Sequence, residues 1–145
     1  MKKILFLLSP LLLGLPGWAT DNAWLLDYDV ALAKAKEANR PILLEFTGST
    51  WCPPCQRLKK ETTSQPKFLQ YAEENLVLVE LDYLSSGEPT NKQFAEKNSN
   101  LLQEYAIEGF PTLVLLNADG EEIARNVGFL PGGPEALISW IEEKK

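Results

Sequence analysis

Hydrophobic residues along the chain recur with two different spacings, which predict alternating helices and strands. In the first such segment, alanines and leucines lie at helical spacing, with Asp27 or Asp29 available as an N-cap and Pro41 as a stop. A helix is therefore expected at about 29–39. The sequence ILLEF at 42–46 follows as a nearly continuous apolar run, which is typical of a strand covered on both faces.

The middle of the chain repeats this alternation. A second helix is expected to begin at the two cysteines and to end near Glu61. A further helix is expected to start at Pro66, because proline suits the first helical turn. The apolar run 76–83 predicts a second buried strand, and a polar loop then leads into a helix at about 92–105.

The last third of the chain predicts a hairpin and a closing helix. Two apolar strands within 111–128 are joined by the sequence NADG at 117–120, which is a strong turn signal. An amphipathic helix is expected over 134–143. The order α, β, α, β, α, β, β, α predicts an α/β fold with a central mixed sheet and helices on both faces.

Composition and charge narrow the function classes. The chain has 145 residues and 45% hydrophobic content, which suits one domain with one packed core. Its formal net charge is −6, and it contains no run of lysine or arginine that could follow a phosphate backbone. We therefore expect no nucleic-acid partner.

The start of the chain reads as an export signal. Two lysines precede an apolar run at 4–15, and the small residues Gly17 and Ala19 follow at the positions that a signal peptidase inspects. We expect a signal peptide at 1–19 and one domain at 20–145. The alternative is an uncleaved membrane anchor, although the apolar run is well short of the ~20 residues of a spanning helix.

The chain has only two cysteines, Cys52 and Cys55. Neither a structural disulfide nor a metal site explains their position well. Closing a four-residue loop stabilises a fold by only about 1.9 kcal/mol, against roughly 3 kcal/mol for fifteen residues. Structural zinc commonly needs four ligands, and the chain has no histidine. A site shared across a dimer, or completed by carboxylates, is the form that a metal centre would take here.

Redox chemistry fits the placement of the cysteines better. A thiol at the start of a helix meets unpaired backbone N–H groups, which stabilise the thiolate. Lowering the thiol pKa from about 8.5 to about 7 raises the ionised fraction at pH 7 from about 3% to half. We expect Cys52 to be the more exposed cysteine and the nucleophile, and Cys55, one turn later, to resolve its mixed disulfides. Pro53 and Pro54 are tolerated in the first turn and limit the freedom of the reduced loop.

These motifs resemble those of the thioredoxin family over essentially the whole mature chain. The sequence WCPPC at 51–55 follows a buried strand, and YAIEGFPTLVLLNADGEEI follows at 105–123. Within the family, the chain looks like exported bacterial proteins of disulfide exchange. The resemblance implies the thioredoxin fold with a four- to five-stranded mixed sheet, a redox-active Cys52–Cys55 disulfide and a periplasmic or otherwise exported location.

The resemblance also implies a substrate-binding surface around the cysteines. We expect it to consist of Trp51, Pro53, Pro54, Phe110, Pro111 and Gly128. Pro111 matches the family's cis-proline, which exposes the backbone of Phe110 to a substrate chain, and Gly128 with Phe129 matches the loop that completes the apolar rim. The alternatives are an ordinary trans proline at a strand start and a Trp51 that only packs.

Glu45, which interrupts the apolar strand, matches the buried acid that moves a proton to and from the second cysteine. Burial raises a carboxyl pKa, so Glu45 is expected to work as an acid and base near neutrality. The alternative is a carboxylate at a solvent-facing strand end. The chain departs from plain thioredoxins in three ways: one extra residue before Cys52, an acid at Glu80 where a lysine is common, and a longer segment at 84–100. Two acids should hinder each other's ionisation, and the longer segment either shapes partner choice or is an inert insertion.

The direction of electron flow depends on how strongly the thiolate is favoured. Potentials in the family run from about −270 to −120 mV, or roughly 7 kcal/mol. Strong oxidases of this fold resemble one another in a histidine between the cysteines, which is absent here. We therefore expect a monomeric thiol-disulfide oxidoreductase without cofactors that reduces or exchanges disulfides in exported proteins. A membrane electron donor is expected to recharge it. The alternatives are an oxidase of the same fold and a non-enzymatic binding module.

Overall fold

The computed structural model of the protein describes residues 23–145. The signal peptide expected at 1–19 lies outside these residues. The strands are β1 (Trp24–Leu25), β2 (Ile42–Thr47), β3 (Val77–Asp82), β4 (Thr112–Leu116) and β5 (Glu122–Val127). The helices are α1 (Tyr28–Ala38), α2 (Pro53–Leu58), α3 (Pro66–Asn75), α4 (Ala95–Glu104) and α5 (Gly133–Lys144).

The five strands form one mixed sheet in the order β1-β3-β2-β4-β5. β1 and β2 both pair in parallel with β3, whereas β4 is antiparallel to β2 and to β5. The expected mixed sheet of four to five strands is therefore confirmed. Since β2 lies at its centre, the segment that follows β2 emerges from the middle of the sheet.

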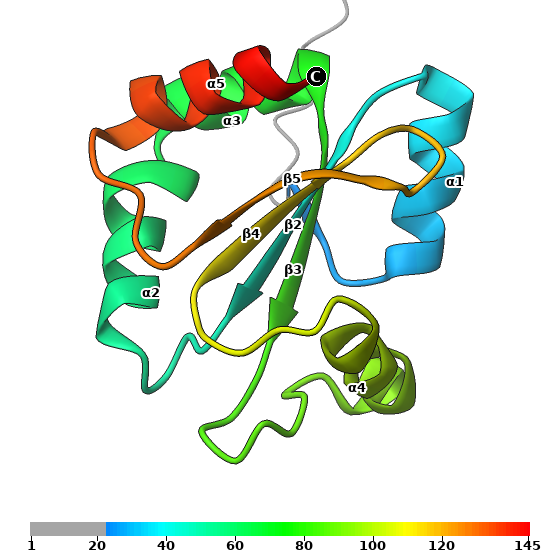
Figure 1. The fold of residues 1–145 in the computed structure, drawn as a ribbon, viewed down its shortest axis with the longest axis vertical. Coiled ribbons are helices and arrows are strands. Elements are labelled where there is room, and N and C mark those ends of the chain that lie inside the picture. Colours follow the sequence, from blue (N-terminus) through cyan, green and yellow to red (C-terminus); the bar gives the residue numbers. More distant parts are fainter. Residues whose placement is uncertain (1–22) are drawn as a thin grey trace, which may run out of the picture.

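Helices cover both faces of the sheet, as the alternating pattern predicts (Figure 1). Alternate residues of β2 point to opposite faces. Ile42, Leu44 and Phe46 pack with residues of α1 and α4, and Leu43 packs with residues of α2, α3 and α5. Glu45 follows the parity of Leu43, so it points toward the face that carries α2.

The starts of three helices agree with the capping and proline signals in the sequence. Asp27 is the N-cap of α1, where its carboxylate accepts a hydrogen bond from the Asp29 amide at 2.9 Å. α3 begins at Pro66, as expected. The helix expected at 92–105 starts with a 3₁₀ turn at Lys92–Phe94 and continues as α4.

Two local features differ from the sequence expectation. β1 was not predicted, because its two residues are too few to show a period; they pair with Leu78 and Val79 of β3. The helix expected to end near Glu61 is α-helical only to Leu58 and continues as a π-helical turn at Lys59–Thr63. In that turn, the Ser64 amide donates to the Lys59 carbonyl at 2.9 Å, five residues back.

Over residues 23–145, none of the helices has both the length and the apolar composition that crossing a bilayer demands.

Candidate active site

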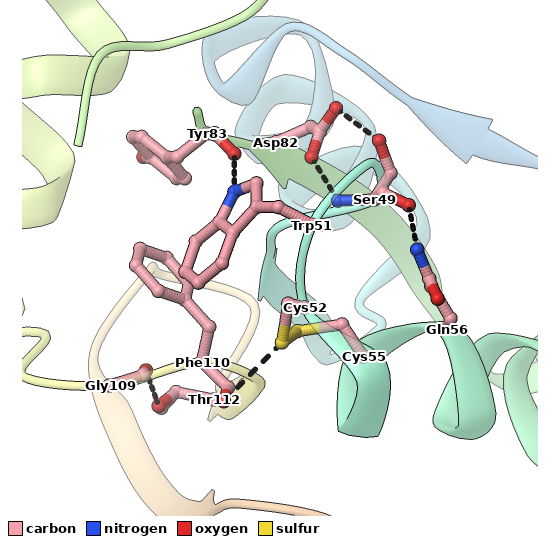
Figure 2. The surroundings of a disulfide bond; sticks show 10 residues. All are labelled: Ser49, Trp51, Cys52, Cys55, Gln56, Asp82, Tyr83, Gly109, Phe110 and Thr112. Atoms are coloured by element: carbon pink, nitrogen blue, oxygen red, sulfur yellow. Dashed lines mark hydrogen bonds between the residues drawn. A yellow bond between two sulfur atoms is a disulfide. The ribbon is translucent and has the colours of Figure 1, made fainter. Parts of the chain in front are cut away.

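The two cysteines form a disulfide at the start of α2, directly after the loop that leaves β2 (Figure 2). Cys52 is the N-cap of the helix, and its amide donates to the Gly48 carbonyl at 3.0 Å. Cys52 is 3% exposed and Cys55 is 1% exposed, so the expected difference in exposure has the right sign but is small. Both sulfur-bearing residues are therefore largely covered by their neighbours in the oxidised protein.

The segment opposite the disulfide contains the Phe110–Pro111 peptide bond, which is cis as the resemblance implies. The Phe110 carbonyl oxygen lies 3.7 Å from the Cys52 Sγ. β4 begins directly after this bond, at Thr112, whose hydroxyl donates to the Gly109 carbonyl at 2.8 Å. The structure thus brings together Cys52 and Phe110, which are 58 residues apart in sequence.

Gly128 holds the Pro111 segment through its backbone. Its amide donates to the Pro111 carbonyl at 2.7 Å, and its φ of +88° lies in the left-handed region that favours glycine. Phe129, expected at the apolar rim, packs its ring against the Arg57 guanidinium of α2, 4.3 Å from the ring centroid. The segment after β5 therefore contacts both the Pro111 segment and α2.

Trp51 forms an exposed apolar wall beside Cys52, with 40% of its surface accessible. Its indole Nε1 donates to the Tyr83 carbonyl at 2.8 Å, and its ring meets Phe110 edge-on at 5.8 Å (Figure 2). A Cβ at Gly48 would lie 2.5 Å from the Trp51 ring, so a larger residue there would displace the ring. Trp51 is thus a packed and hydrogen-bonded residue that also faces solvent.

Asp82, at the end of β3, anchors the loop before Cys52, a role that sequence reasoning missed. Its carboxylate accepts from the Ser49 amide at 2.8 Å, from the Ser49 hydroxyl at 2.7 Å and from the Thr90 hydroxyl at 3.1 Å. The Ser49 carbonyl in turn accepts from the Gln56 side chain at 3.0 Å. The only sequence signal was a polar residue at a strand end, which does not indicate its partners.

The first part of the 84–100 segment folds back onto β3 beside Trp51. The Thr90 amide donates to the Asp82 carbonyl at 2.9 Å, and Leu84 pairs with Glu88 across a tight loop. Leu84 is 37% exposed next to Tyr83, whose carbonyl holds the Trp51 indole. The rest of the segment forms the 3₁₀ turn and the start of α4.

Glu45 is buried beneath α2, with only 1% of its surface exposed. Within residues 23–145, neither of its carboxyl oxygens has a hydrogen-bond partner. Burial, reinforced by the nearby Glu80 carboxylate, raises the pKa of Glu45 to about 8, although the Lys59 ammonium and the nearby Thr63 hydroxyl act in the opposite direction. The alternative of a solvent-facing carboxylate is wrong, and the expected rise in pKa is confirmed.

Glu80 lies directly across from Glu45 in the β2–β3 pairing, as the sequence suggested. The structure adds a cation that sequence reasoning missed: the Lys59 Nζ lies 2.6 Å from the Glu80 Oε2. Lys59 comes from the π-helical turn after α2, 21 residues before Glu80. The negative charge of Glu80, opposite Glu45, is therefore compensated by the Lys59 ammonium.

The described residues contain no group of three or more His, Cys, Asp or Glu side chains arranged to hold a metal ion. The chemistry that the arrangement offers is that of the two sulfurs, the Phe110 backbone opposite them and the buried carboxyl group of Glu45 on the face of the sheet that α2 covers.

Comparisons with known proteins agree with this geometry. The family model for a thioredoxin-like domain matches residues 28–145. The chain is 36% identical over 115 residues to the disulfide bond reductase DsbH of Chlamydia pneumoniae, an alignment that covers 79% of this chain and 68% of the relative. It is also 36% identical over 102 residues to the thioredoxin-related protein DsbJ of the same organism, covering 70% of this chain but only 29% of that longer protein.

A solved structure described as DsbH oxidoreductase superposes on this chain with a TM-score of 0.75. The identity is 31%, and the match covers 94% of this chain and 93% of the other.

Proposed function

Since the chain belongs to the family of thioredoxin-like domains, has the thioredoxin fold and is a thiol-disulfide oxidoreductase of that family, we propose that it reduces or exchanges disulfides in exported proteins. The observation that carries the proposal is the Cys52–Cys55 disulfide at the start of α2, with the Phe110 carbonyl 3.7 Å from the Cys52 Sγ. This arrangement supports the proposal, because the Cys52 sulfur lies beside a backbone carbonyl with which an extended substrate can pair.

The reaction starts from the reduced protein and proceeds in two exchanges. The Cys52 thiolate attacks one sulfur of a substrate disulfide, forming a Cys52–substrate disulfide and releasing the other substrate sulfur as a thiolate. The Cys55 thiolate then attacks the Cys52 sulfur, which forms the Cys52–Cys55 disulfide and releases the second substrate thiolate. The two substrate thiolates take up protons, so the substrate gains two electrons and the protein loses two.

Glu45 serves the second exchange as a proton acceptor. Cys55 is buried, and burial disfavours its thiolate unless a base removes the proton. Glu45 lies beneath the same helix, and its pKa of about 8 leaves it able to take and return a proton near neutrality.

Substrate binding uses the backbone of Phe110 and the apolar surface beside it. A carbonyl oxygen next to the nucleophile can accept a hydrogen bond from a substrate chain lying along it. Trp51, Pro53 and Pro54 are exposed around the disulfide and supply sequence-independent apolar contact. Such a surface suits unfolded or flexible segments of varied sequence.

A reducing direction is favoured over an oxidising one. The chain has no histidine, so none stands between the cysteines to stabilise the Cys52 thiolate. The relative DsbH is named a disulfide bond reductase, which agrees with this direction. A measured potential above about −150 mV indicates an oxidase instead.

The proposed setting follows from the amino-terminal signal. A cleaved signal peptide at 1–19 exports the domain at 20–145 to the periplasm, where it works as a monomer. Disulfides form in that compartment, so a reductase there must be recharged with electrons. We assign this step to a membrane protein that donates electrons through thiols of its own.

The first test traps the mixed disulfide. Replacing Cys55 with serine removes the resolving thiol, so Cys52 should stay bonded to its substrates in cells. The measurement is non-reducing electrophoresis and mass spectrometry of the captured proteins. Cys52→Ser is the matched control, because it keeps one thiol but loses the nucleophile and should trap little. Failure of Cys55→Ser to capture any exported protein would contradict exchange.

A further inference from the structure

We propose that the Lys59–Glu80 ion pair is a positioning pair that controls whether Glu45 carries a charge when the cysteines react. The inference rests on the proposed function, since it assigns Glu45 a part in proton transfer. Neither residue touches the sulfurs of a substrate. Both act through Glu45.

The first step of the argument is the sheet register. Glu45 of β2 and Glu80 of β3 are directly opposite in parallel strands. Both point to the face that α2 covers, because Glu80 has the parity of Leu78, which packs with Leu58 of α2. Glu45 is buried, whereas the Glu80 side chain is 18% exposed. Glu80 is therefore the more exposed of the two acids.

The second step is the position of Lys59, one turn after Cys55. The Lys59 amide donates to the Cys55 carbonyl, and the π-helical turn begins at Lys59 itself. Lys59, Cys55 and Thr47 line one hollow of about 390 Å³ beside the disulfide. From there the Lys59 Nζ reaches the Glu80 Oε2 at 2.6 Å. The pair thus connects the surroundings of Cys55 to those of Glu45.

The third step is to account for the other charges around Glu45. β4, its other neighbour, contributes only threonine and apolar residues at Thr112–Leu116. β3 contributes Glu80 and Asp82, and the Asp82 carboxylate is occupied by hydrogen bonds to Ser49 and Thr90. α3 and α5 contribute apolar residues such as Phe68 and Leu137 to this face. The π-helical turn contributes the buried Thr63, whose hydroxyl lowers the pKa of Glu45. Lys59 is the cation that acts on Glu45.

The two members of the pair act on Glu45 in opposite directions. The Glu80 carboxylate repels a second negative charge and raises the pKa of Glu45, whereas the Lys59 ammonium lowers it. With both present the effects partly cancel, and burial remains the largest cause of the raised pKa. Removing one charge of the pair leaves the other charge uncompensated. The two single substitutions must therefore shift the pKa of Glu45 in opposite directions.

The direct test measures the titration of Glu45 by the ¹³C chemical shift of its carboxyl group. The oxidised protein is used, because its cysteines are bonded and do not titrate. In Glu80→Gln the midpoint should fall by roughly one pH unit, and in Lys59→Met it should rise by a similar amount. In the double variant, Glu80→Gln with Lys59→Met, it should lie between the two.

A second Lys–Glu pair of the same chain supplies matched controls. Lys67 of α3 and Glu135 of α5 form an exposed ion pair at 2.5 Å, outside the surroundings of Glu45. Lys67→Met and Glu135→Gln remove the same charges and should leave the Glu45 midpoint unchanged. A purely structural role of the Lys59–Glu80 pair would change the melting temperature without moving the midpoint in opposite directions. Unchanged midpoints, or midpoints that move the same way, overturn the inference.

A kinetic readout separates this inference from the proposed function. The rate at which Cys55 resolves a Cys52 mixed disulfide should rise in Glu80→Gln and fall in Lys59→Met at pH 7, by several-fold in each case. At that pH roughly one Glu45 in ten is ionised when its pKa is about 8. If the wild-type protein exchanges no disulfides, the proposed function fails, but the titration of the oxidised protein still decides the inference.

Discussion

Glu45 is an acid on a central strand whose neighbours in sequence are apolar and buried. A residue with two unpartnered carboxyl oxygens destabilises a fold whenever it is ionised, because its charge is removed from water. An apolar residue would pack there without this penalty. The protein therefore gives up stability at the position where the proposed chemistry needs a proton acceptor.

The effect of Glu45 on the free energy of unfolding depends on pH. Its sign follows from the direction in which the pKa of Glu45 is shifted. The folded pKa is about 8 and the ordinary value is 4.5, so the folded state holds the proton over a range where the unfolded state has lost it. Stability contributed by the protonated acid is complete below about pH 4.5 and declines until about pH 8.

Glu45→Gln should therefore unfold at nearly the wild-type urea concentration at pH 4. At pH 8.5 it should be more stable, by on the order of 3–5 kcal/mol. The measurement is urea unfolding of both oxidised proteins across this range. All other groups are shared, so the difference isolates Glu45. Glu108→Gln, at an exposed glutamate, is the control and should show no such trend. A pH-independent difference would contradict a buried, proton-holding Glu45.

At the scale of elements, the loop between β2 and α2 positions Cys52. The structure shows what holds this loop. Asp82 binds Ser49 on one side and Thr90 on the other. The same aspartate therefore ties the loop before the cysteines to the start of the 84–100 segment.

Asp82→Ala should loosen both loops together. The Ser49 amide loses a charged acceptor, so we expect a loss of roughly 2–3 kcal/mol in the free energy of unfolding. Hydrogen exchange should become faster at the amides of Ser49 and Thr90. Asp119→Ala, in the exposed β4–β5 turn, is the matched control. Faster exchange at Ser49 alone would show that the two loops are not coupled through Asp82.

At the scale of the whole molecule, folding and redox potential are linked by one thermodynamic cycle. The oxidised and reduced proteins differ in their free energy of unfolding. This difference equals the difference in reduction potential between the folded and the unfolded dithiol, when that potential is expressed as a free energy. A strong oxidase is more stable when reduced, because its fold stabilises the thiolate. A reductase has the opposite order.

We expect the oxidised protein to be the more stable form. Closure of the four-residue loop alone contributes about 2 kcal/mol. The measurement compares urea midpoints with and without a dithiol reductant. A variant with Cys52→Ala and Cys55→Ala should have the same midpoint in both conditions. A higher urea midpoint for the reduced form than for the oxidised form would favour the oxidase alternative.

Local sequence determined most of the elements and the central pair of sulfurs. Helix and strand periods, Pro66 as a helix start and the NADG turn are short-range signals, and they predicted the α/β order. The WCPPC motif marked the two sulfurs through their residue type, and the resemblance to the thioredoxin family pointed to Glu45. β1 escaped because two residues show no period.

Only the tertiary structure decided how these residues act on one another. The Lys59–Glu80 pair joins residues 21 apart, and the Asp82–Ser49 and Cys52–Phe110 contacts join residues 33 and 58 apart. No periodic pattern reports such contacts, because they depend on the register of β2 against β3 and on the π-helical turn that follows α2. Burial works in the same way: a glutamate becomes a proton acceptor near neutrality only once neighbouring elements exclude water from it.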